Sequence, residues 1–158
     1  MQKLALLFVT FSMLVLSGPT FAVVAADKHT GNVIVSSKRN EISGGLLSSM
    51  HATAVFSKRK GYGIGVEYLT TGSGWAHFAE VWSNGKQYRY DAAAGRVLGC
   101  TGGCSLLEGG AIRLNQSEFN LAAKQGFEFK IIGSGDSIVA KVPAELFRQV
   151  LNELARIR

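Results

Sequence analysis

The segment from residue 61 to 68 constrains the fold of this chain more than any other. Large apolar or aromatic residues alternate there with three glycines and a glutamate: Tyr62, Ile64, Val66 and Tyr68 against Gly61, Gly63, Gly65 and Glu67. A period of two places alternate side chains on opposite faces of a β-strand. One face of this strand is therefore apolar, and the other is nearly bare backbone that a strand, a helix or a ligand can approach closely.

The dipeptide Asn84-Gly85 lies between two further alternating segments. Asn-Gly is a strong hairpin signal because a type I′ turn needs positive φ at both positions. A two-residue loop places Val81 opposite Tyr88 and Glu80 opposite Arg89. We therefore expect a hairpin in which the second of these pairs forms a cross-strand ion pair.

Two more hairpins follow from the same reasoning. If Thr101-Gly102-Gly103 forms the first loop, the facing pairs are Cys100 with Cys104, Leu98 with Leu106, and Arg96 with Glu108. The segment 127–142 turns around Gly133-Ser134-Gly135-Asp136. Its facing pairs put Phe129 with Ala140 on an apolar face and Glu128 with Lys141 on a charged one, which is typical of a sheet with one face on the core.

Two helices are predicted. A short helix near 117–125 starts with Ser117 as its cap and ends before Gly126. An amphipathic helix near 143–156 starts at Pro143, and its apolar residues recur at helical intervals and face the core: Leu146, Phe147, Val150, Leu151 and Leu154. The predicted fold is mainly β, leaning to α+β: a small antiparallel sandwich or a partly open barrel built from hairpins.

The N-terminus is typical of a signal peptide. Lys3 precedes the apolar run Leu4–Leu16, and small residues follow around Ala22 and Ala26, either of which can precede the cleavage site. The run is shorter than the roughly 20 residues that span a bilayer. We expect residues 1–26 to be removed and 27–158 to form a single β-rich domain that does not span the membrane. The expected location is the periplasm, or otherwise outside the cell.

The composition narrows the function only slightly. The net charge of +6 falls to +5 when Lys3 leaves with the leader, a modest basic excess. A dinucleotide-binding fingerprint, GxGxxG, that began at Gly61 would need its third glycine at position 66, where this chain has Val66. The hydrolase motif GxSxG and the metalloprotease motif HExxH are also missing from the sequence. We therefore lean towards a protein that is not an enzyme, and expect no catalytic residue, cofactor or metal ligand.

Cys100 and Cys104 are the only cysteines. A straight strand would hold their Cα atoms about 13 Å apart, whereas a disulfide needs about 5.5 Å. Thr-Gly-Gly between them allows the necessary turn, and an exported chain favours a structural disulfide. The three-residue spacer resembles that of the Sco family of copper chaperones, whose thioredoxin-like βαβ pattern is missing here. Thiol-redox chemistry and copper binding by this pair are the alternatives.

Two surfaces are candidate binding sites. The outer face of the Asn-Gly hairpin is a possible binding face with aromatic and planar polar groups: Phe78, Glu80, Trp82, Gln87 and Arg89. The alternative is that both hairpin faces are buried in a sandwich. A basic patch forms if the first two strands are neighbours, from Lys38, Arg39, Lys58, Arg59 and Lys60. The alternative for the patch is a solvated turn.

The function that these observations favour is a non-catalytic binding or accessory protein of the cell envelope. Its expected partner is an envelope protein, a glycan or a lipid. Nucleic acid is not expected, because basic residues are not densely interleaved with aromatic ones. The alternatives are a periplasmic thiol-redox or copper-binding protein that uses Cys100 and Cys104, and a binder of anionic membrane or polymer that uses the basic patch.

Overall fold

A long antiparallel sheet of seven strands dominates the computed structural model, which describes residues 22–157. The strand order is β1-β2-β4-β5-β9-β8, and β3 pairs with β4 off this path. The strands of this large sheet are β1 (Val23–Ala26), β2 (Val33–Ser36), β3 (Asn40–Gly44), β4 (Ser48–Ser57), β5 (Gly61–Thr71), β8 (Tyr90–Cys100) and β9 (Cys104–Leu114). The order has two free ends, so the sheet is open.

A small antiparallel sheet of four strands and two helices complete the described chain. The small sheet has the order β11-β10-β6-β7. Its strands are β6 (Phe78–Ser83), β7 (Lys86–Tyr88), β10 (Phe127–Gly133) and β11 (Ser137–Val142), and the helices are α1 (Gln116–Gln125) and α2 (Ala144–Arg156). The predicted mainly β fold of antiparallel sheets with two short helices is confirmed.

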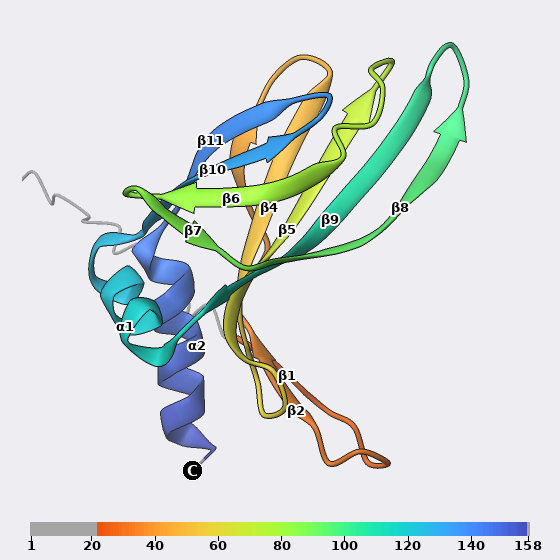
Figure 1. Cartoon of the computed structure of the whole chain (residues 1–158). Helices are drawn as coiled ribbons and strands as arrows, with labels where there is room; N and C mark the ends of the chain where they lie inside the picture. The colour runs from red at the N-terminus through yellow and green to blue at the C-terminus, as the bar shows by residue number, and fades with distance from the viewer. Residues whose placement is uncertain (1–21, 158) are drawn as a thin grey trace, which may run out of the picture.

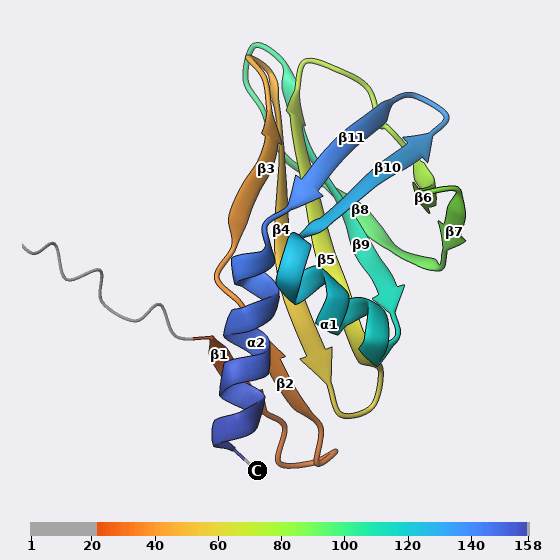
Figure 2. The same ribbon diagram turned by 90° about the vertical axis from the view of Figure 1, so that its left-hand side faces the viewer.

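Both helices and the small sheet lie on the same side of the large sheet. Figure 1 shows both helices to the left of the large sheet, and Figure 2 shows α1, α2, β10 and β11 in front of β4 and β5. The core fills the space between these layers, where Phe119, Phe129 and Phe147 are buried completely. The apolar stripe of α2 enters this core as predicted. The opposite face of the large sheet is therefore left uncovered by any other described element.

The Asn-Gly hairpin forms as predicted near its turn and departs from the prediction further away. Asn84 and Gly85 have φ values of 48° and 76°, and Val81 lies opposite Tyr88. The chain then leaves the small sheet, and β8 joins β9 of the large sheet. The predicted ion pair of Glu80 with Arg89 is wrong, because Arg89 Nε lies 2.8 Å from Asp91 Oδ1 instead.

The hairpin of β8 and β9 has the predicted loop but a shifted register. Cys100 lies opposite Cys104, as expected. Arg96, however, lies opposite Leu107 rather than Glu108, and Val97 rather than Leu98 lies opposite Leu106. Register shifts between residues 93 and 96 and between 97 and 99 are the cause, since each extra residue of a bulge displaces the pairing beyond it.

The hairpin of β10 and β11 has the predicted register, with Glu128 opposite Lys141. The helix starts differ slightly from the prediction. Asn115, not Ser117, caps α1: its side chain accepts the N–H of Glu118, whose carboxylate accepts the N–H of Asn115. Pro143 precedes the first helical residue of α2. Strands β1 and β3 were not expected, and β1 occupies residues 23–26 of the predicted leader; residues 1–21 lie outside the described part.

Candidate functional site

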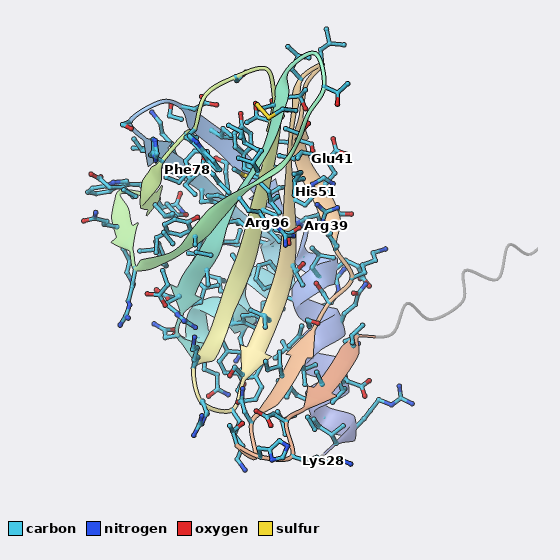
Figure 3. All side chains as sticks on the ribbon, turned by 90° about the vertical axis from the view of Figure 1, so that its right-hand side faces the viewer. Lys28, Arg39, Glu41, His51, Phe78 and Arg96 are labelled. Carbon is cyan, nitrogen blue, oxygen red and sulfur yellow. A yellow bond between two sulfur atoms is a disulfide. The ribbon has the colours of Figure 1, made fainter. Side chains whose placement is uncertain are left out.

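The uncovered face of the large sheet carries a groove with a volume of about 610 Å³. Its residues follow from the strand alternation: Ile64 and Val66 of β5 are buried in the core, so Gly65 and Glu67 face outwards. The cross-strand register then forms two adjacent rows, which are His51, Glu67, Gly109 and Ala93, and Thr53, Gly65, Ala111 and Asp91. Figure 3 looks onto this face and labels His51, Arg39 and Arg96 over the middle of the sheet.

The groove exists because the side chains in the middle of both rows are small. Gly65, Gly109, Ala111 and Ala93 form its floor. A Cβ on Gly109 would lie 2.8 Å from the carbonyl oxygen of Val66, so the backbone itself requires glycine there. A Cβ on Gly65 would meet only the carbonyl oxygen of Thr53, at 3.8 Å. The bare face that the sequence predicts for β5 is thus the open floor of this groove.

Ion pairs stand on both sides of the floor. Arg39 Nε donates to Glu67 Oε2 at 2.8 Å, and Arg113 Nε donates to Asp91 Oδ2 at 2.6 Å. The hydrogen bond from Arg113, followed by that from Arg89, lowers the pKa of Asp91. Both carboxylates are therefore already engaged by arginine.

Two further cations in the groove have no such partner. Arg96 and Lys60 line the groove, and within residues 22–157 neither side chain makes an ion pair or a hydrogen bond. Arg96 reaches this position because the shifted register of β8 places it opposite Leu107, which faces outwards. The groove thus combines two neutralised carboxylates with two uncommitted positive charges, an arrangement that favours a negatively charged ligand.

His51 lies between β3 and β5 in the same groove. Its Nε2 is 3.9 Å from Glu41 Oε2, and its side chain is 17% exposed. Its Nδ1 is buried and has no hydrogen-bond partner in the described chain. A proton on Nδ1 would be a buried donor without an acceptor, so Nε2 is the nitrogen that carries the proton of the neutral ring.

A second hollow, with a volume of about 400 Å³, adjoins the groove across β8. The two hollows share Ala92, Ala93 and Glu108 among their lining residues. The second hollow adds the rings of Trp75 and His77, whose centroids are 6.4 Å apart. An aromatic surface therefore lies on the far side of the edge strand from the cationic groove.

Glu108 holds the loop that carries these two rings. It is only 8% exposed, and its two oxygens accept the backbone N–H groups of Ala76 and His77, the latter at 2.8 Å. His77 has a φ of 51°, which costs a non-glycine residue about 1–2 kcal/mol. Trp75 in turn packs against Gly95, where a Cβ would lie 2.5 Å from the ring.

The binding face predicted on the Asn-Gly hairpin is only partly assembled. Glu80, Trp82 and Gln87 are exposed on the small sheet, and Trp82 Nε1 donates to Glu80 Oε2 at 3.0 Å. Arg89 is exposed next to Asp91. Phe78, however, faces the core and is 7% exposed. An irregularity in the pairing of β6 with β10 puts Phe78 and Glu80 on opposite faces. Binding by this face stays a prediction.

The predicted basic patch is divided among three places. Arg39 and Lys60 line the groove. Lys58 and Arg59 lie in the turn between β4 and β5, where the N–H of Arg59 donates to Asn32 Oδ1 at 3.3 Å. Lys38 lies nearer α2, since its N–H donates to Gln149 Oε1 at 3.1 Å. Binding of an anionic polymer by the whole patch stays a prediction.

The predicted disulfide is present. Cys100 and Cys104 are bonded at the end of the hairpin of β8 and β9, and both residues are exposed. Within the described residues, no group of three or more His, Cys, Asp or Glu side chains is placed to hold a metal ion. Redox or copper chemistry at the pair stays a prediction.

Comparison with known protein families, with curated proteins and with solved structures finds no match for this chain. In the part of the chain that the structure describes, neither helix has the length and apolar character needed to cross a membrane. Five of the groove residues were not anticipated from the sequence: His51, Glu67, Asp91, Arg96 and Arg113. They come from four strands, since Asp91 and Arg96 are both on β8. The glycine alternation of β5 was the one local signal that pointed to the place where they meet.

Proposed function

We propose that this protein is an exported binding protein of the cell envelope, and that the groove on the uncovered face of the large sheet binds a small anionic ligand. The observation that carries the proposal is the pair of uncommitted cations, Arg96 and Lys60, beside a floor of glycine and alanine. The groove volume of about 610 Å³ falls within the range of roughly 300–1,000 Å³ that is typical of small-molecule sites.

Charge is the strongest support for an anionic ligand. The carboxylates of Glu67 and Asp91 are each engaged by an arginine, so they add little repulsion. A ligand carboxylate or phosphate would give Arg96 the ion pair that the folded chain does not provide. The proposed location outside the cytoplasm rests on the leader-like N-terminus, and the Cys100–Cys104 disulfide is compatible with an oxidising compartment.

The proposal is tested by calorimetric titration of the folded protein with citrate, inorganic phosphate and galacturonate. We expect at least one of these anions to bind, with an affinity that falls as the salt concentration rises. The variant Gly65→Val fills the floor of the groove without a backbone clash and should weaken binding at least ten-fold. The variant Arg96→Gln should weaken it by a similar factor.

Each variant has a matched control. Gly99→Val makes the same substitution on β8, where a Cβ meets nothing within 4 Å. Lys130→Gln removes an exposed charge from β10, away from the groove. Both controls should bind like the unmodified protein. The proposal is wrong if none of the three anions binds, or if Gly65→Val binds them as well as Gly99→Val does.

A further inference from the structure

We infer, on the basis of the proposed function, that the ligand of the groove is an acidic oligosaccharide. Its carboxylate would lie at Arg96, and a neighbouring sugar ring would cross β8 and stack on Trp75. Three features of the molecule support this ligand: the polar groups around the floor, the shape of the strand between the two hollows, and the aromatic surface beyond that strand.

The polar groups of the groove suit a ligand with many hydroxyl groups and few charges. Glu67 and Asp91 keep acceptor positions free beyond their bonds to arginine, since an ionised carboxylate can accept about four hydrogen bonds. Hydroxyl groups can donate to these oxygens and accept from Arg96 or His51 Nε2. Arg96 and Lys60 are only two uncommitted cations, so most of the charges of a polyphosphate would find no partner in the groove. One carboxylate per sugar ring matches the two uncommitted cations better.

The strand between the two hollows, β8, carries side chains that are small enough for a chain of sugar rings to cross it. β8 is the edge strand of the large sheet. Between the two hollows it consists of three alanines and a glycine, Ala92 to Gly95. Ala92 to Gly95 are all exposed. The register shift after Ala93 also removes Ala94 and Gly95 from regular pairing with β9. A ligand can therefore lie across the edge without displacing a large side chain.

The ring of Trp75 lies where the next sugar of the oligosaccharide would bind. Trp75 packs against Gly95, and Gly95 directly precedes Arg96 in the chain. The charge and the ring are thus on neighbouring positions, one on each side of the edge strand. Glu108 and the turn between β10 and β11 hold the Trp75 loop, since Gly135 N–H donates to the carbonyl oxygen of Ala76 at 3.0 Å. A held, half-buried indole is a suitable surface for the apolar face of a sugar ring.

Trp75 provides the signal for the test. The chain has two tryptophans, so the variant Trp82→Phe leaves Trp75 as the one indole fluorophore. This protein is titrated with trigalacturonate, galacturonate, maltotriose, triglutamate and tripolyphosphate, and binding is followed by Trp75 emission and by calorimetry. We expect trigalacturonate to bind at least ten-fold more tightly than the other four and to change the emission of Trp75.

Two variants separate the two parts of the site. Arg96→Gln should weaken trigalacturonate and galacturonate alike. Trp75→Ala, measured by calorimetry, should weaken trigalacturonate at least ten-fold and leave galacturonate unchanged. The inference is overturned if maltotriose, triglutamate or tripolyphosphate binds as tightly as trigalacturonate, or if Trp75→Ala has no effect. Those results would leave the proposed binding of a small anion in the groove intact. A complete lack of binding by every charged probe would contradict the proposed function as well.

Discussion

Glu108 links the core of the molecule to the surface around the groove. Its side chain points to the core side of β9, yet the nearest groups that satisfy it are two backbone N–H donors of the loop before β6. A buried carboxylate that receives two such donors imposes a loop conformation, including the positive φ of His77. Neither partner could be recognised from the sequence, because the loop and β9 are distant along the chain.

Replacement of Glu108 by glutamine tests this role. An amide presents one acceptor oxygen in place of two, so one backbone N–H loses its partner. We expect Glu108→Gln to lower the free energy of unfolding by about 1–3 kcal/mol, measured by urea denaturation. The matched variant Glu128→Gln, on the exposed face of β10, should change it by less than about 0.5 kcal/mol. Equal effects of the two variants would contradict the role assigned to Glu108.

Ionisation of the Tyr90 side chain is expected to destabilise the folded protein at high pH. Burial, followed by the negative charge of Glu108, raises its pKa from 10.0 to about 12. As the pH rises, the unfolded chain therefore releases this proton before the folded chain does. The contribution of Tyr90 to the free energy of unfolding is complete below pH 10 and is lost as the pH rises towards 12. The expected loss is about 1–2 kcal/mol after allowance for the partly exposed ring. Tyr90→Phe should remove this part of the alkaline loss in urea denaturation between pH 9 and 12; an unchanged pH dependence would show that Tyr90 does not contribute.

At the scale of elements, local signals predicted the hairpins well and their continuation poorly. The turns at Asn84-Gly85 and at residues 133–136 gave correct registers beside them, because short loops determine pairing through their own backbone geometry. The bulges of β8 and the transfer of the chain from the small to the large sheet after Tyr88 depend on contacts with distant strands. These are the places where the predicted pairs of Glu80 and Arg96 were wrong.

The disulfide should stabilise one hairpin rather than the whole fold. It closes a loop of sequence separation 4 at the exposed end of β8 and β9. A loop this short gives an entropic stabilisation of about 2 kcal/mol. We expect the double variant Cys100→Ser, Cys104→Ser to remain folded, with a free energy of unfolding lower by about that amount in urea. Failure of this variant to fold would mean that the bond holds together more than the hairpin.

At the scale of the whole molecule, the layers explain both the core and the site. Helices and the small sheet cover one face of the large sheet, and the glycines of β5 and β9 leave the other face hollow. The sequence indicated the mainly β class, the disulfide, both helices and the bare face of β5. It did not indicate that His51 of β4 and Asp91 and Arg96 of β8 line the same groove. Their convergence is a property of sheet order, which no local pattern encodes.

The most direct test of the account is to locate the bound anion. A ¹H–¹⁵N NMR titration of the folded protein with galacturonate reports on every backbone amide. We predict that the largest shifts fall on Gly65, Gly109 and Arg96, and that Gly65→Val abolishes them. Shifts confined to the exposed face of β6 and β7, around Trp82, would instead assign binding to the hairpin face and contradict the groove as the functional site.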